Sequence, residues 1–215
     1  EPLLEKLGFS SIDEQWQAAL ERYRESLAIR PREVKTLNDL GILHKKMGQI
    51  DSAVGFYREA LKVDPDYINS HYNLAIALTD QGLSGEGSRE YLRVLELQPG
   101  HVGACTNLAL LLERRGRYQE SAKLLRDGLT YSPEQPVLLL RLGWLLATAP
   151  DSNARNGPEA LVLAVRLYEV TDESDPEIFD VLAAAYAEVR RFDDAVQTAM
   201  RAAKLASEQD RPKLA

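Results

Sequence analysis

Residues 34–65 decide the fold of this chain, and they read VKTLNDLGILHKKMGQIDSAVGFYREALKVDP. Their small, apolar and proline positions return 34 residues later, and again after a further 34 residues. The three sets are Leu37, Leu40, Gly41, Gly48, Ala53, Tyr57, Ala60, Pro65; then His71, Leu74, Ala75, Gly82, Gly87, Tyr91, Val94, Pro99; then Cys105, Leu108, Ala109, Gly116, Ser121, Leu125, Gly128, Pro133. A fixed period of this length indicates an array of repeats rather than one globular core.

Each period predicts two helices. Apolar residues follow helical spacing from Val34 to Leu43, which predicts a first helix over residues 34–47. Gly48 then allows the left-handed stop that ends many helices, and Asp51 is a suitable N-cap for a second helix to Val63. Pro65 ends the period because proline cannot continue a helix.

Small residues recur where the two helices of a pair must approach each other. They are Gly41, Ala75, Ala109, Gly143 and Ala183 in the first helices, and Ala53, Gly87, Ser121, Ala160 and Ala195 in the second. A helix pair this short cannot bury both of its faces alone, so we expect each pair to stack on its neighbours.

These positions resemble the tetratricopeptide repeat motif, Trp-x2-Leu-Gly-x2-Tyr, then Ala-x3-Phe, then Pro. The matching residues are Leu37, Leu40, Gly41, His44, Ala53, Tyr57 and Pro65. Leu37 and His44 depart from the motif's Trp and Tyr, and the pattern covers nearly the whole chain. The resemblance implies an all-α, right-handed superhelical solenoid of antiparallel helix pairs. The last two units are also similar to the closing repeats of long bacterial repeat proteins.

We expect one solenoid over residues 1–215. It would hold a partial repeat at 1–33, regular repeats at 34–67, 68–101 and 102–135, a repeat with a loop insertion at 136–175, and a last repeat with a tail at 176–215. The first unit keeps mainly its second helix, which Ser11 to Glu14 would open as a capping box. No full capping helix is visible in residues 207–215.

The fifth unit breaks the period. Gly143 and Ala160 are 17 residues apart, whereas the corresponding residues of other units are 12 apart. The added residues fall in 149–157, whose composition is typical of turns, and Pro158 would open the next helix. We interpret the insertion as a surface loop in preference to a loop that contacts a ligand.

Composition argues against several function classes. The net charge of −7 disfavours nucleic acid as a partner, and no apolar run is long enough to span a bilayer. A single cysteine excludes an internal disulfide framework. No catalytic, metal-binding or phosphate-binding motif is visible, so we expect neither enzymatic activity nor a cofactor. Because the chain opens with Glu1 rather than Met, we expect a processed or excised segment, and the compartment stays unassigned.

Candidate binding residues lie on the first helices, which line the groove of such arrays. One row, 34 residues apart, is Asp39, Asn73, Asn107 and Arg141. By resemblance to the asparagine ladder of O-linked N-acetylglucosamine transferases, Asn73 and Asn107 would hold a peptide backbone, since an amide both donates and accepts. Equally, these amides could bond within their own or the adjacent helix. Asp39 and Arg141 interrupt the row.

A second row is Ile42, Ile76, Leu110 and Trp144. We interpret Ile76 and Leu110 as padding between helices and Trp144 as a contact for a ligand side chain, because tryptophan is enriched among binding hot spots. Asn38 and Tyr72 complete the candidate set. The lysines of the dicarboxylate clamp found in chaperone-binding repeats are absent from the corresponding places.

The sequence therefore predicts a non-catalytic scaffold for protein–protein interaction that binds a peptide or partner segment in its groove. One alternative is a regulatory or substrate-recognition domain of a larger enzyme, such as a glycosyltransferase-like or membrane enzyme. Another is a structural protein that self-associates through its terminal helices. The identity of the ligand is not predicted.

Overall fold

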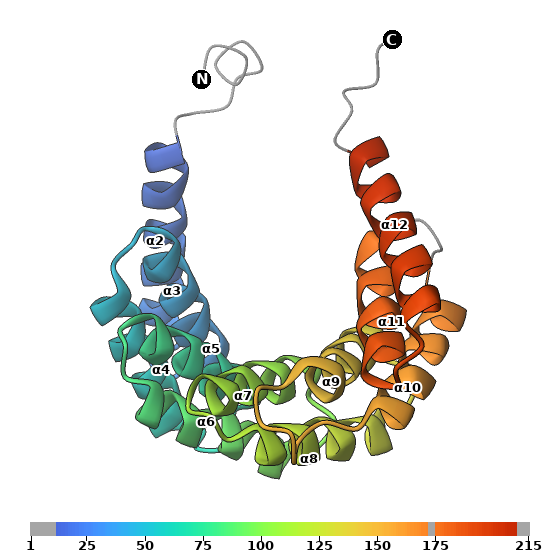
Figure 1. The fold of residues 1–215 in the computed structure, drawn as a ribbon. Coiled ribbons are helices and arrows are strands. Elements are labelled where there is room, and N and C mark those ends of the chain that lie inside the picture. The colour runs from blue at the N-terminus through green and yellow to red at the C-terminus, as the bar shows by residue number, and fades with distance from the viewer. Residues whose placement is uncertain (1–11, 172–174, 210–215) are drawn as a thin grey trace, which may run out of the picture. The chain divides into compact units, whose positions relative to one another are not determined.

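A computed structural model describes residues 12–171 and 175–209, and all regular structure in these residues is helical (Figure 1). The chain divides into two compact units, residues 1–98 and 99–215. The boundary lies at Pro99, the proline that closes the second of the three periods. Ser11 of the predicted capping box and the end of the predicted tail lie outside the described residues.

Antiparallel helix pairs build both units. Unit 1 contains α2 (Ile12–Ile29), α3 (Val34–Lys46), α4 (Ile50–Val63), α5 (Ile68–Asp80) and α6 (Ser84–Leu97). Unit 2 contains α7 (Val102–Arg114), α8 (Tyr118–Tyr131), α9 (Pro136–Thr148), α10 (Gly157–Val170), α11 (Pro176–Glu188) and α12 (Phe192–Gln209). Each pair packs on its neighbour within the unit, as α4 packs on α5 and α9 on α11. The all-α array of stacked pairs predicted from the period is confirmed.

Four turns that join the helices of a pair end the first helix in the same way. Gly48, Gly82 and Gly116 have φ of +76°, +82° and +72°. The following amide returns to a carbonyl five residues earlier, as Gln49 N donates to His44 O at 2.9 Å. In the last repeat Arg190 takes this position with φ of 62°, and Arg191 N donates to Tyr186 O at 2.9 Å. An arginine thus occupies a position that favours glycine.

Replacing Arg190 with glycine is expected to stabilise the chain by roughly 0.5–1 kcal/mol. The left-handed conformation costs a residue with a Cβ about 1–2 kcal/mol, and the greater freedom of glycine in the unfolded chain offsets part of the gain. The Arg190 side chain is exposed, so little contact is lost. Urea unfolding measures the change, and the reverse substitution Gly116→Arg should destabilise the chain. A less stable Arg190→Gly variant would show that the arginine side chain contributes more than its backbone costs.

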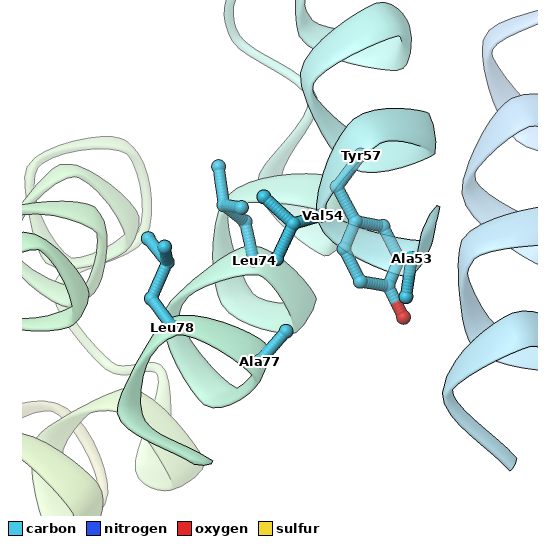
Figure 2. Close-up of a cluster of buried hydrophobic side chains, with 6 residues drawn as sticks. All are labelled: Ala53, Val54, Tyr57, Leu74, Ala77 and Leu78. Carbon is cyan, nitrogen blue, oxygen red and sulfur yellow. The ribbon is translucent and has the colours of Figure 1, made fainter. Parts of the chain in front are cut away.

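The core of unit 1 is centred on Tyr57, which is 1% exposed (Figure 2). It packs with Ala53 and Val54 of its own helix and with Leu74, Ala77 and Leu78 of α5. A Cβ built on Gly41 of α3 would lie 2.6 Å from Tyr57 Cδ1, so the small residue at this position leaves room for the ring. Close approach of the two helices of the pair therefore requires glycine here.

The core of unit 2 repeats this arrangement with leucines. Leu139, Leu142 and Leu146 of α9 are at most 1% exposed. A Cβ on Gly143 would lie 3.0 Å from Val181 Cγ1, so α9 and α11 also approach closely at a small residue. Cys105 is buried, and its thiol donates to Leu124 O at 3.3 Å. Burial, aided by Asp127, raises the pKa of the Cys105 thiol to about 11, so the group is protonated at neutral pH.

The inserted loop of the fifth unit packs against its own unit. Ala149 and Ala154 are buried, and Asn156 N donates to Leu146 O at 2.9 Å. Arg155 pairs with Glu188 of α11 at 3.2 Å. Helix α10 begins at Gly157 with Asn156 as its cap, so Pro158 is the second helical residue rather than the first. The loop thus anchors the start of α10 to the end of α11.

Candidate functional site

The predicted asparagines of unit 1 bond to each other. Asn38 of α3 is 3% exposed, and its Oδ1 accepts from Asn73 Nδ2 at 3.0 Å and from Ser70 Oγ at 3.2 Å. Both donors belong to α5. Asn38 therefore links two successive first helices from the interior. Asn73 thus bonds to an adjacent helix, which is the alternative to binding a peptide backbone that the sequence left open.

The other candidates of unit 1 are half-buried. Asp39 faces Tyr23 of α2, whose pKa is raised by desolvation and by the negative charge of Asp39. The Tyr72 ring is tilted against the Tyr91 ring, with 6.0 Å between centroids. Ile42 packs against the Tyr57 cluster. In this unit the candidate residues are mostly engaged with their own chain.

Unit 2 has a groove of about 390 Å³ between its first helices α7, α9 and α11. It brings together two residues of the predicted set, Arg141 and Trp144, both on α9. The remaining lining residues are Glu113, Leu140, Glu177, Asp180 and Val181. Asn107 of α7 is half-buried and is not among the lining residues. We name this site the α9 groove.

Trp144 is the large apolar side chain at the α9 groove. It is 48% exposed, whereas Gly143 and Leu145 beside it are buried. An indole this exposed is not part of the core, and its edge can still bury considerable area against a ligand. No residue of the inserted loop 149–156 lines the groove, in line with our interpretation of that loop as a surface connection.

Arg141 is incompletely satisfied. Its Nη2 lies 3.4 Å from Glu113 Oε2, a long contact, and its buried Nε has no hydrogen-bond partner among the described residues. Glu113 is held in place from the other side by Ser121 Oγ, which donates to Oε1 at 2.9 Å. Most buried polar atoms in proteins have a partner, so this Nε is an exception. The exposed part of the Arg141 side chain keeps N–H donors that can bind an acceptor.

Sequence reasoning missed five lining residues, and the period could have found two of them. The row that contains Arg141 continues at Val181, which precedes Ala183 by two residues as Arg141 precedes Gly143. The distance exceeds 34 residues because of the insertion in the fifth unit. Asp180 corresponds in the same way to Leu140. Glu113 and Glu177 lie near opposite ends of their helices, and only the packing of three helices brings them to one groove.

The histidines form no common site. His44 is half-buried, with Nδ1 2.6 Å from Gln49 Oε1 and its ring stacked on Phe56. His101 accepts from Ala104 N as the N-cap of α7, and burial lowers its pKa. Among the described residues, no group of three or more His, Cys, Asp or Glu side chains is arranged to hold a metal ion. In that same part of the chain, no helix combines the length and apolar character that a membrane span requires.

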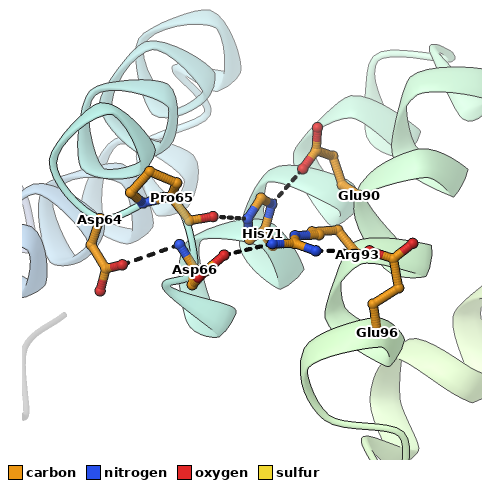
Figure 3. A network of polar contacts seen from close by, with 7 residues as sticks. All are labelled: Asp64, Pro65, Asp66, His71, Glu90, Arg93 and Glu96. Carbon is orange, nitrogen blue, oxygen red and sulfur yellow. Dashed lines mark hydrogen bonds and ion pairs between the residues drawn. The ribbon is translucent and has the colours of Figure 1, made fainter.

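His71 belongs to a polar network in unit 1 (Figure 3). Its Nδ1 lies 2.6 Å from Glu90 Oε2 and its Nε2 lies 2.8 Å from the Pro65 carbonyl oxygen. Nearby, Arg93 pairs with Asp66 and Glu96. Desolvation and Arg93 lower the pKa of His71, but the bonds to Glu90 and Pro65 raise it more, so the pKa is raised overall.

The raised pKa of His71 should make one contribution to the free energy of unfolding that decreases as pH rises. A raised pKa in the folded state means that folding favours the imidazolium. The contribution is complete below the ordinary value of 6.5 and is lost as pH increases through the raised pKa. Unfolding free energies of the wild type and Glu90→Gln between pH 5.5 and 8.5 isolate it, since the opposite effect of His101 is common to both. An equal pH slope in the two proteins would contradict this role of Glu90.

Helix α12 carries an exposed apolar stripe. Phe192, Val196 and Met200 are 62%, 60% and 68% exposed, and Ala199 and Ala203 lie on the same side at helical spacing. Trp16 at the other predicted end is half-buried against Leu20, Leu40 and Leu43. The stripe on α12 is thus the more open of the two terminal faces.

Comparison with known families agrees with the period. A family model described as TPR repeat matches residues 45–82, and one described as Tetratricopeptide repeat matches residues 72–137. Residues 45–137 therefore contain recognised tetratricopeptide repeats. Such repeats indicate a scaffold for protein–protein interaction. No curated protein sequence matches the chain.

Solved structures share the fold at low sequence identity. YrrB, described as a TPR protein with an unusual peptide-binding site, matches with a TM-score of 0.69 and 15% identity, covering 85% of this chain and 91% of YrrB. MamA from Desulfovibrio magneticus RS-1 matches with a TM-score of 0.66 and 17% identity, covering 83% and 97%. Another MamA structure reaches 0.69 with 18% identity, covering 85% and 96%. At such identities the likeness establishes the fold alone.

Proposed function

We propose that this protein is a non-catalytic scaffold that binds an extended segment of a partner protein in the α9 groove. The observation that carries the proposal is the pairing of an exposed indole, Trp144, with a partly exposed guanidinium, Arg141, in one groove. A ligand side chain packs on the indole and a ligand carbonyl accepts from the arginine. The peptide-binding site of YrrB supports such a use of this fold.

The size of the groove favours a short segment. Its volume of about 390 Å³ lies at the lower end of the range for ligand pockets, roughly 300–1,000 Å³. Its walls are successive first helices, which side chains of an extended chain can contact in turn. We also retain Asn107 of unit 2 and Asn73 of unit 1 as proposed contacts for a peptide backbone, each within its own unit, with Asn73 required to exchange its bond to Asn38.

Selection from a displayed library of random 12-residue peptides tests the proposal. Peptides selected on the wild type should bind Trp144→Ala and Arg141→Ala at least tenfold more weakly, with unchanged helical circular dichroism, because neither side chain forms the core. Tyr131→Ala is the matched control, since Tyr131 is a 61% exposed aromatic residue of the same unit outside the groove. An empty selection, or peptides that bind both groove variants like the wild type, would overturn the proposal.

The stripe on α12 favours a second candidate function, self-association. Three large apolar side chains at spacing i, i+4 and i+8 form a face that another helix can cover. Light scattering should then show a mass that rises with concentration, and Val196→Glu together with Met200→Glu should abolish the rise. A constant monomeric mass for the wild type would exclude this candidate.

A further inference from the structure

We infer that the partner segment presents a basic side chain, specifically an arginine next to an apolar residue, to the α9 groove. This inference rests on the proposed function and specifies its ligand. It follows from the charge of the groove, from the chemistry of its aromatic wall, and from the way this chain already holds its own guanidinium groups.

The α9 groove carries an excess of negative charge. Its lining contains three carboxylates, Glu113, Glu177 and Asp180, and one cation, Arg141. Glu113 already contacts Arg141 and Ser121. Glu177 and Asp180 are exposed on α11, and no ion pair or side-chain hydrogen bond engages their carboxylates within the described residues. The α11 wall therefore offers two uncompensated carboxylates to a ligand.

The position of Glu177 has a purely local explanation that does not extend to Asp180. Glu177 lies in the first turn of α11, where a negative charge interacts favourably with the helix dipole. Asp175 already caps that end, with Oδ1 accepting from Glu177 N at 3.0 Å. Asp180 lies beyond the first turn and gains little from the dipole. Its place beside Val181 in the groove lining is therefore better explained by a cationic ligand.

The aromatic wall selects the kind of cation. A guanidinium stacks on an indole face and can pair with a carboxylate at two points, whereas an ammonium is more strongly hydrated and bonds as a point charge. Unit 2 contains two such contacts internally. Arg201 lies 4.4 Å from the Phe179 ring centroid, and Arg191 lies 4.6 Å from that of Tyr186 while pairing with Asp194 at 2.7 Å. In the α9 groove, Trp144 and the carboxylates of Glu177 and Asp180 offer the same combination to a guanidinium group of a ligand.

The remaining lining residues define the rest of the segment. Leu140 and Val181 form an apolar floor that suits an aliphatic or aromatic neighbour of the arginine. Arg141 repels a second cation on its side of the groove, so the ligand guanidinium lies at the α11 wall. The exposed part of the Arg141 guanidinium then donates to a backbone carbonyl of the segment.

Fluorescence polarisation with the peptides selected on the wild type tests this inference. Those that depend on Trp144 should contain an arginine, and its replacement by citrulline, which is uncharged and nearly isosteric, should weaken binding at least tenfold. The double variant Glu177→Gln with Asp180→Asn should lose a similar factor and should flatten the dependence of binding on salt. Glu134→Gln with Glu169→Gln is the matched control, since both carboxylates are exposed in unit 2 outside the groove.

A charge exchange completes the test. Asp180→Arg should reject the arginine peptide and should bind the same peptide carrying glutamate in place of arginine. Peptides that depend on Trp144 but contain no cation, or that bind the double variant as tightly as the wild type, would overturn the basic-segment inference and leave the proposed groove standing. Peptides whose binding survives Trp144→Ala would instead overturn the groove itself.

Discussion

Replacing Tyr57 with alanine is expected to destabilise the chain by about 3–5 kcal/mol, the range measured for large aromatic residues removed from cores. Tyr57 is 1% exposed and fills the space that Gly41 leaves between α3 and α4. It also contacts the α5 residues of the next pair, so its loss weakens both the pair and the stacking of pairs. Burial raises the pKa of its hydroxyl to about 12, which reflects the same exclusion of water.

Urea unfolding monitored by circular dichroism measures this loss, and Tyr131→Ala provides the comparison. Tyr131 is 61% exposed, so its removal should change the free energy of unfolding by less than roughly 0.5 kcal/mol. Tyr57→Phe should retain most of the stability, because the ring supplies the packing. A Tyr57→Ala variant as stable as Tyr131→Ala would show that the α3–α4–α5 contacts are not as described.

The helices could be predicted because glycine and proline mark most boundaries of the period. The predicted first helix over residues 34–47 corresponds to α3, Val34–Lys46, and the predicted second helix from Asp51 to Val63 corresponds to α4, Ile50–Val63. Even Arg190, which replaces the expected glycine, keeps the left-handed φ. The ends of a helix depend mainly on residues that are close in sequence, so a repeated local pattern is sufficient to predict them.

The groove could be predicted only in part, because it depends on contacts between helices that are distant in sequence. Arg141 and Trp144 were predicted from two separate rows, but a 34-residue step from Arg141 leads to Asp175, whereas the structure places Val181 in the groove. The insertion in the fifth unit shifts the register, so the row has to be counted again from Ala183, the small residue that follows Gly143 in the array. The lining residues on α11 therefore do not fall at a 34-residue step from those on α9.

The asparagines show a second limit of sequence reasoning. An amide has the same hydrogen-bonding groups whether its partner is a ligand or another side chain. Asn73 donates to Asn38, and this pairing depends on the buried position of Asn38, which the spacing of the repeat does not reveal. Burial and partner must both be known before an amide is assigned to a site.

Enlarging the small residues between paired helices is the second large effect that we expect. Ala75→Leu in unit 1 and Ala109→Leu in unit 2 should each destabilise the chain by about 1–3 kcal/mol through overpacking. Both alanines are 0% exposed. Beside Ala75, a Cβ on Gly87 of α6 would lie only 2.9 Å from the Ala75 carbonyl oxygen. Helices α5 and α6 are therefore already in close contact at this point, and a larger side chain would force them apart.

The matched controls are Ala18→Leu on α2 and Ala187→Leu on α11, which add the same atoms at exposed helical positions. These should change the free energy of unfolding by less than roughly 0.5 kcal/mol, since leucine and alanine both favour helices. Thermal and urea unfolding distinguish the two groups. If the buried and exposed variants melt together, the assignment of Ala75 and Ala109 to the helix contacts is wrong. If only one buried variant is destabilised, the register holds in its unit and fails in the other.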